Sequence, residues 1–157
     1  MRHNPFKIVE MFEETVADYT GAPYAVSVNS CTNALPYPIY DSAKRLTSGM
    51  YIPGSFMTLS FHIKKHLKMG KGGMILTDNK EAAEWFLRAR YEGRSKVKYH
   101  EDNIEICGWN MYMTPQEAAH GLALMQNFPE HNEDLPENPP YRDLREFELF
   151  KNVEVAG

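Results

Sequence analysis

Residues 60–77 read SFHIKKHLKMGKGGMILT, and this stretch decides how we expect the chain to fold. It joins the end of an aromatic-containing apolar run, 56–61, to a second apolar run, 74–77, through a basic loop and a glycine-rich turn. Runs of this length and composition are typical of buried strands. The stretch therefore predicts two strands, with a lysine-rich loop directly after the first.

The rest of the chain alternates between helical and extended patterns. Caps, apolar spacing and closing glycines or prolines predict amphipathic helices at 5–20, from 78 or 79 to about 91, and at 115–128. Further strands are expected at 24–28 and 39–41, the second after Pro36 and Pro38 have interrupted a helix of about one turn. This order predicts an α/β domain with a mostly parallel sheet and a ligand site at the carboxyl ends of its strands.

The length and composition fit one globular domain, since the chain has 157 residues of which 43% are hydrophobic and 24% charged. We expect residues 1–128 to form that domain and the proline- and acid-rich residues 129–157 to be irregular. A net charge of -4 argues against a nucleic-acid-binding domain. The chain has no apolar run of ~20 residues, and its two cysteines are expected to be free thiols, which indicates a cytoplasmic protein.

Lys65 is the candidate nucleophile of the basic loop. It follows a buried strand and is flanked by cationic and apolar neighbours. Desolvation and nearby positive charge both favour the neutral amine, which is the form that attacks an aldehyde. The alternative is that Lys64, Lys65 and Lys68 belong to an ordinary solvated loop.

Three groups of motifs carry a family resemblance. Residues 60–65 (SFHIKK) and 70–77 (GKGGMILT) closely resemble the lysine segment of the DegT/DnrJ/EryC1/StrS sugar aminotransferases, which are fold type I enzymes that use pyridoxal phosphate. Upstream, residues 12–35 look like that family's first helix, first strand and phosphate-binding turn. Downstream, residues 108–122 are similar to its glycine-aromatic-asparagine segment and the helix that follows. The resemblance covers most of residues 6–128 and implies an α/β fold of the aspartate aminotransferase type.

The resemblance also implies roles for individual residues. Lys65 would hold the cofactor covalently, and Asp41 would pair with the pyridine nitrogen and keep it protonated. The implied phosphate ligands are Thr32, Asn33, Ser60 and, from the neighbouring subunit, Asn110. By its spacing alone, Asp41 also suits a helix cap, and residues 31–33 suit an ordinary turn.

The sequence departs from the family in its middle and at its end. Only residues 36–40 separate the phosphate turn and its helix from Asp41, so a central section with further strands and helices is absent. Lys44 stands where many relatives have Gln or His, and Tyr112 stands where they have Arg. The region after Phe128 does not resemble the family's small domain.

Several functions stay open on this basis. The resemblance implies transfer of an amino group from an amino acid such as glutamate to a nucleotide-linked keto sugar, in a homodimer that uses pyridoxal phosphate. A shortened relic of the same fold, acting as a binding or assembly module, is the alternative. A phosphate- or nucleic-acid-binding module could use the basic stretches 62–71 and 94–100. A zinc site of His62, His66, His100 and Cys107 matches no structural-zinc spacing.

Overall fold

The computed structural model describes residues 4–30, 39–137, 139, 142–143 and 146–148. The elements in chain order are α1 (Lys7–Thr20), β1 (Tyr24–Val28), β2 (Ile39–Asp41), β3 (Phe56–Ser60), β4 (Gly73–Thr77), α2 (Lys80–Ala89), the short 3-10 helix η2 (Tyr99–Glu101) and α3 (Pro115–Met125). The expected strands and helices are therefore present, with ends within a few residues of their predicted positions. The one-turn helix expected before Pro36 lies outside the described residues.

The four strands form one mixed sheet in the order β1-β4-β3-β2. β2 and β3 are parallel, whereas β4 runs antiparallel to both of its neighbours, β1 and β3. This corrects the expectation of a mostly parallel sheet. Parallel neighbours need a long crossover, usually a helix, and the connection 61–72 between β3 and β4 contains no helix, so the chain returns in the opposite direction.

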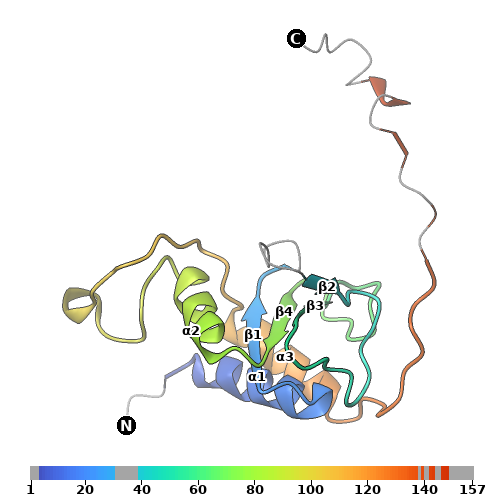
Figure 1. Cartoon of the computed structure of the whole chain (residues 1–157), viewed down its shortest axis with the longest axis horizontal. Helices are drawn as coiled ribbons and strands as arrows, with labels where there is room; N and C mark the ends of the chain where they lie inside the picture. Colours follow the sequence, from blue (N-terminus) through green and yellow to red (C-terminus); the bar gives the residue numbers. More distant parts are fainter. Residues whose placement is uncertain (1–3, 31–38, 138, 140–141, 144–145, 149–157) are drawn as a thin grey trace.

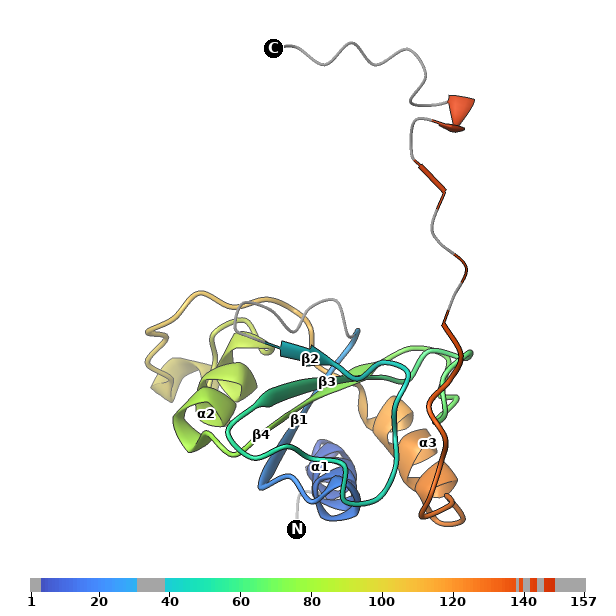
Figure 2. The same ribbon diagram turned by 45° about the vertical axis from the view of Figure 1, so that its right-hand side comes forward.

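Helices cover the sheet from both sides, as Figures 1 and 2 show. α1 and α3 pack on one face, over a core that includes Phe12, Met57, Leu59, Met74 and Leu76. α2 packs on the other face against β1 and β4, over a smaller core of Val26, Val28, Ile75, Ala83 and Phe86. The domain is thus a three-layer α/β arrangement, and α2 lies over only one half of its face.

The helix ends follow the local signals in the sequence. Gly21 ends α1 in a left-handed conformation (φ 77°), which glycine adopts without the strain of a side chain. The Asn79 side chain accepts a hydrogen bond from the Ala82 amide at the start of α2. At the start of α3, Thr114 and Glu117 form a reciprocal capping box.

Residues 129–137, called the strap below, run across the domain surface without a helix or strand. The carbonyl of Pro129 accepts a hydrogen bond from the Tyr19 hydroxyl at 2.6 Å, and the Asn132 amide group donates to the Leu46 carbonyl at 2.9 Å. Further along, the Leu135 amide donates to the Lys44 carbonyl at 2.9 Å. The strap is therefore held along the 44–48 segment, and the described residues beyond 137 extend away from the domain (Figure 1).

Candidate functional site

The carboxyl ends of β1, β2 and β3 lie at one edge of the sheet. The strand registers place Val28, Gly73 and Ser60 in one row across β1, β4 and β3. Asp41, the last residue of β2, pairs with Thr58, two residues before Ser60. The topology thus brings Asp41 and Ser60 to the same edge.

Asp41 and Ser60 also belong to the same face of the sheet. Phe56 packs edge-to-face on Phe86 of α2, with ring centroids 6.0 Å apart, so this residue of β3 faces α2. Because side chains alternate along a strand, Thr58 and Ser60 share the face of Phe56. Asp41 is the cross-strand partner of Thr58 and therefore lies on this face too. α2 packs mainly on β1 and β4 and meets β3 through Phe56, whereas Thr58 is buried and Ser60, at the end of β3, is partly exposed.

Asp41 makes a local contact. It is exposed, and one carboxylate oxygen accepts a hydrogen bond from the Ala43 amide at 2.9 Å. This is the geometry of a capped turn, and no helix follows it. The second carboxylate oxygen has no partner among the described residues.

Lys65 lies in the loop 61–72, five residues beyond Ser60. Its amide donates to the His62 carbonyl at 2.8 Å, and the amide of Lys64 donates to the His62 ring at 3.2 Å. In this turn the Lys65 side chain is half-buried, whereas Lys64 is exposed. No carboxylate in the described part of the chain forms an ion pair with Lys65.

Asn110 reaches the same edge of the sheet within its own chain. The next residue, Met111, accepts a hydrogen bond from the Asn29 amide at 2.8 Å, directly after β1. The Asn110 side chain is exposed and donates to Glu92 at 3.1 Å. The remaining predicted phosphate ligands, Thr32 and Asn33, lie outside the described residues.

The groups gathered at this edge have the chemistry that pyridoxal phosphate requires. An amine can hold the aldehyde, a carboxylate can pair with a ring nitrogen, and hydroxyl and amide groups can donate to a phosphate. Among the described residues, the strand registers bring Asp41 and Ser60 to one edge, and the Asn29–Met111 hydrogen bond brings the Asn110 segment there. Lys65 lies in the loop that leaves this edge after β3. The residues present therefore fit the cofactor that the resemblance implies.

Sequence reasoning missed a buried polar network between α1, β1 and the end of α2. Glu13 accepts hydrogen bonds from the Ser27 amide at 2.9 Å and the Ser27 hydroxyl at 2.8 Å, and it also pairs with Arg90. Glu13 and Arg90 are each 8% exposed. The visible signal was the serine in the middle of the apolar strand YAVSV, because a buried hydroxyl needs a partner.

The described residues contain no group of three or more histidine, cysteine or acidic side chains placed to hold a metal ion. His62, His66, His100 and Cys107 therefore do not converge. His66 instead contacts the Glu133 carbonyl of the strap at 2.9 Å. No helix in the described part of the chain is long and apolar enough to cross a membrane.

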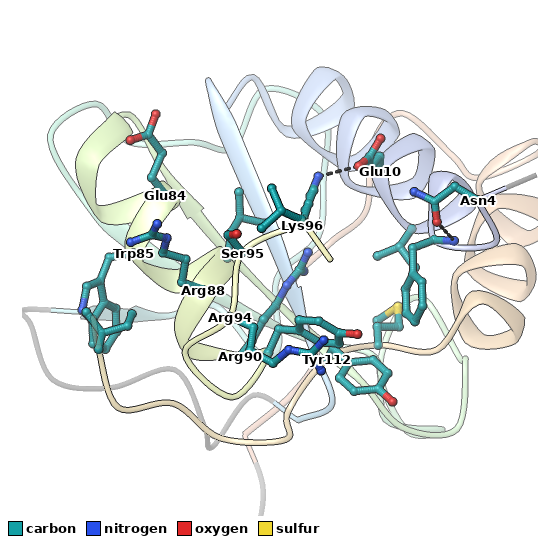
Figure 3. A pocket seen from close by; sticks show the side chains of 17 residues that line it. Asn4, Glu10, Glu84, Trp85, Arg88, Arg90, Arg94, Ser95, Lys96 and Tyr112 are labelled. Carbon is teal, nitrogen blue, oxygen red and sulfur yellow. Dashed lines mark hydrogen bonds and ion pairs between the residues drawn. The ribbon is translucent and has the colours of Figure 1, made fainter. Parts of the chain in front are cut away.

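A cavity of about 720 Å³ lies elsewhere in the domain, between α1, α2 and the segment that follows α2 (Figure 3). Arg88, Arg90, Arg94 and Lys96 line it together with aromatic side chains. Neither Lys65 nor any predicted cofactor residue within the described part of the chain lines this cavity. The cavity and the Lys65 edge are therefore two distinct features.

Comparison with solved structures shows the same fold in sugar aminotransferases. Helicobacter pylori PseC, an aminotransferase involved in the biosynthesis of pseudoaminic acid, superposes with a TM-score of 0.61 at 14% identity, over 82% of this chain and 59% of that one. NtdA from Bacillus subtilis, solved with bound cofactor PMP, gives 0.59 at 19% identity, over 77% and 48%. DesI, solved in the presence of its TDP-sugar product, gives 0.61 at 17% identity, over 79% and 54%. This chain thus spans about half to three fifths of the length of these structures.

No curated protein shows significant sequence similarity to the chain. The model of the DegT/DnrJ/EryC1/StrS aminotransferase family matches residues 3–39 and 49–142. The match includes Lys65, Ser60 and Asn110 and continues beyond 128, where the motifs had ended, but it is interrupted at 40–48, which contains Asp41. The fold is that of the fold type I pyridoxal-phosphate-dependent transferases in a shortened form, and the chain belongs to the DegT/DnrJ/EryC1/StrS aminotransferase family.

Proposed function

We propose that this chain transfers an amino group from an amino acid such as glutamate to a nucleotide-linked keto sugar, with pyridoxal phosphate attached to Lys65. The observation that carries the proposal is that Lys65 is half-buried in the loop after β3, five residues beyond Ser60, and that β3 is the neighbour of the strand that Asp41 ends. Membership of an aminotransferase family and the likeness to DesI support the reaction type and the substrate class.

Each residue of the edge has a distinct part in this proposal. Lys65 holds the cofactor and, when its amine is free, takes and returns a proton at the substrate carbon. Asp41 pairs with the ring nitrogen, and the phosphate ligands are Ser60, Thr32, Asn33 and, from the neighbouring subunit, Asn110. The bound cofactor supplies an electron sink for the negative charge that develops at that carbon.

The test is attachment of the cofactor to a defined lysine. Purified protein is incubated with pyridoxal phosphate, its visible absorbance is recorded, and borohydride reduction is followed by peptide mapping. We expect a visible band and a pyridoxyl group on Lys65, and we expect Lys65→Ala to remove both while Lys64→Ala keeps them. Attachment to Lys64 with Lys65 unmodified contradicts the assignment.

A second candidate is a non-catalytic binding or assembly module that descends from the same fold. It is favoured by the coverage, because the chain spans only 59% of PseC and the family match is interrupted at 40–48. Protein that gains no visible band with pyridoxal phosphate, while remaining folded by circular dichroism, supports this candidate over the enzyme.

The proposal extends to the organisation of the protein. Residues 1–128 form the domain that carries the site, residues 129–157 are an irregular accessory segment, and the working form is a cytoplasmic homodimer. The small number of cysteines fits a reducing compartment.

A further inference from the structure

The cavity beside α2 has the size and lining of a small-molecule site. Its volume of about 720 Å³ falls within the range of known ligand pockets, roughly 300–1,000 Å³. It is bounded by the first half of α1, the second half of α2 and residues 91–97, as Figure 3 shows. The mixture of apolar walls with a few charged groups is typical of sites that orient a ligand as well as enclose it.

All but one of the charged side chains that line the cavity have an oppositely charged partner. The pairs are Lys96 with Glu10, Glu84 with Lys80 at 3.8 Å, Arg88 with Glu105 at 3.5 Å, and Arg90 with Glu13. Arg94 is the exception within the described part of the chain. The cavity therefore holds one positive charge without a salt-bridge partner among the described residues, although Arg94 also acts on the Asp102 carboxylate, whose pKa is lowered most by the Ser95 hydrogen bond and further by Arg94.

Arg94 is also short of a hydrogen-bond acceptor. Its Nε is buried and has no partner among the described residues. The nearby carboxylate of Asp102 is held by Ser95, through its amide at 2.8 Å and its hydroxyl at 2.6 Å. A buried N–H without an acceptor is unfavourable, so an anion that entered beside the partly buried Arg94 and shifted its side chain would supply the missing acceptor.

Aromatic rings form the wall beside Arg94. Its guanidinium lies over the Tyr91 ring, 5.0 Å from the centroid. Tyr91, Tyr112 and Phe6 pack edge-to-face with centroids 5.2 to 6.2 Å apart, and all three line the cavity. Such a wall favours a flat ring, which can pack on it in stacked or edge-to-face geometry.

We propose that this cavity binds a small molecule that consists of a planar ring and one anionic group, with the anion at Arg94 and the ring against Tyr91, Tyr112 and Phe6. The anion is a phosphate or a carboxylate, since the Arg guanidinium pairs with both. The site is independent of Lys65 and of the proposed cofactor.

Trp85, which lines the cavity, provides the measurement. The chain has two tryptophans, and the other, Trp109, does not line the cavity, so Trp109→Phe leaves Trp85 as the only one. In that background the full chain is titrated with phenyl phosphate and with benzoate, which distinguish the two anions. Phenol is the ring without the charge, and inorganic phosphate is the charge without the ring.

We expect saturable quenching of Trp85 by phenyl phosphate or benzoate, and binding at least about tenfold weaker for phenol and for inorganic phosphate. Arg94→Gln should weaken binding by at least about tenfold, whereas Arg45→Gln, at an exposed arginine outside the cavity, should leave it unchanged. If Arg94→Gln fails to fold, Arg94→Lys, which keeps the charge but lacks the Nε donor, replaces it with the same expectation.

Three results overturn the proposal. The first is the absence of saturable binding by either ringed anion up to its solubility limit. The second is equal affinity in the Arg94 variant and the parent. The third is loss of phenyl phosphate binding in Lys65→Ala, which would place the probe at the proposed cofactor site instead of the cavity. Because no cofactor is added, the outcome is separate from the test of aminotransfer.

Discussion

Arg90 and Glu13 place a full positive and a full negative charge in the interior, each 8% exposed. Removal of one partner from a buried ion pair leaves the other charge without compensation, which costs about 3–5 kcal/mol. We therefore expect Glu13→Ala to lower the free energy of unfolding by about that amount in a urea titration. The exposed neighbour Glu14 provides the control, since Glu14→Ala should change the free energy of unfolding by less than about 0.5 kcal/mol.

The substitution Asp41→Asn distinguishes two possible roles of the Asp41 carboxylate. If it pairs with the cofactor ring, Asp41→Asn should leave attachment to Lys65 intact but lose ~3 kcal/mol of transition-state stabilisation, which slows the half-reaction with glutamate about a hundredfold. If it only accepts the hydrogen bond from Ala43, asparagine replaces it well and the rate should be unchanged. Stopped-flow absorbance of the bound cofactor gives the rate, and equal rates in variant and parent reject the electrostatic role.

For single residues, the sequence predicts those features that depend on neighbours along the chain. The turn from His62 to Lys65 is local, so the order of its residues is enough to indicate it. The pairing of Glu13 with Arg90 joins residues 77 positions apart, and no local pattern encodes it. Asp41 shows the limit of motif transfer, because its exposed capped turn is equally consistent with a local role.

Among the helices, α3 offers an acid-sensitive contact at its first turn. Burial alone would raise the pKa of Glu117, but hydrogen bonds from the Thr114 amide and hydroxyl, together with Lys71, outweigh it and hold the pKa below its usual 4.5. A folded-state pKa below the unfolded value stabilises the protein above that unfolded value, and the stabilisation is lost as the pH falls through the folded pKa.

Glu117→Gln should therefore lower the unfolding free energy at pH 7, and the difference from the parent should shrink as the pH falls below about 4.5. Urea titrations at a series of pH values measure the difference. A gap between variant and parent that stays constant down to pH 3 would show that the carboxylate charge contributes nothing.

The contact between α1 and α3 depends on the absence of a side chain at Gly121. A Cβ there would lie 2.5 Å from the Phe12 ring, which is fully buried. Gly121→Ala should force the helices apart and cost about 1–3 kcal/mol, despite the better helix propensity of alanine. His120→Ala, at an exposed adjacent position, serves as control, and thermal unfolding of both variants decides whether the close approach matters.

Elements were predicted well where their signals are local and less well where they are not. The capping residues Asn79 and Thr114 act within one turn, so they fixed the starts of α2 and α3. Strand direction depends on which distant segments pair, and the apolar runs carry no information on it. The antiparallel direction of β4 became apparent only in the structure, where β4 pairs with both β1 and β3.

At the scale of the whole molecule, we expect two copies of the chain to associate through exposed apolar side chains. Large apolar or aromatic side chains at least half exposed occur on several segments: Tyr40, Ile63, Val97, Tyr99 and Trp109. We expect a second copy of the chain to cover part of this surface, since apolar surface that is contiguous is normally buried by a partner. Sedimentation velocity at micromolar concentration should show a species of about twice 18.1 kDa.

A matched pair of variants tests whether the exposed aromatic residues contribute to that association. Tyr99→Glu should shift the protein toward monomer, whereas Lys98→Glu, a charge change at the neighbouring exposed position, should do so much less. A stable parent monomer under these conditions rejects the homodimer and with it the role of Asn110 as a phosphate ligand from the neighbouring subunit.

The central position of β4 also constrains when the domain can assemble. β1 ends at Val28, but its partner in the sheet begins only at Gly73, so the emerging chain must carry the first strand unpaired through synthesis of more than forty further residues. β3 and β4, in contrast, are joined by the single loop 61–72 and can pair as soon as both have left the ribosome. The lysine loop is thus shaped within an early hairpin-like unit, while α1 and β1 dock onto it later. Until that unit exists, the apolar face of the first helix has no complete sheet to pack on.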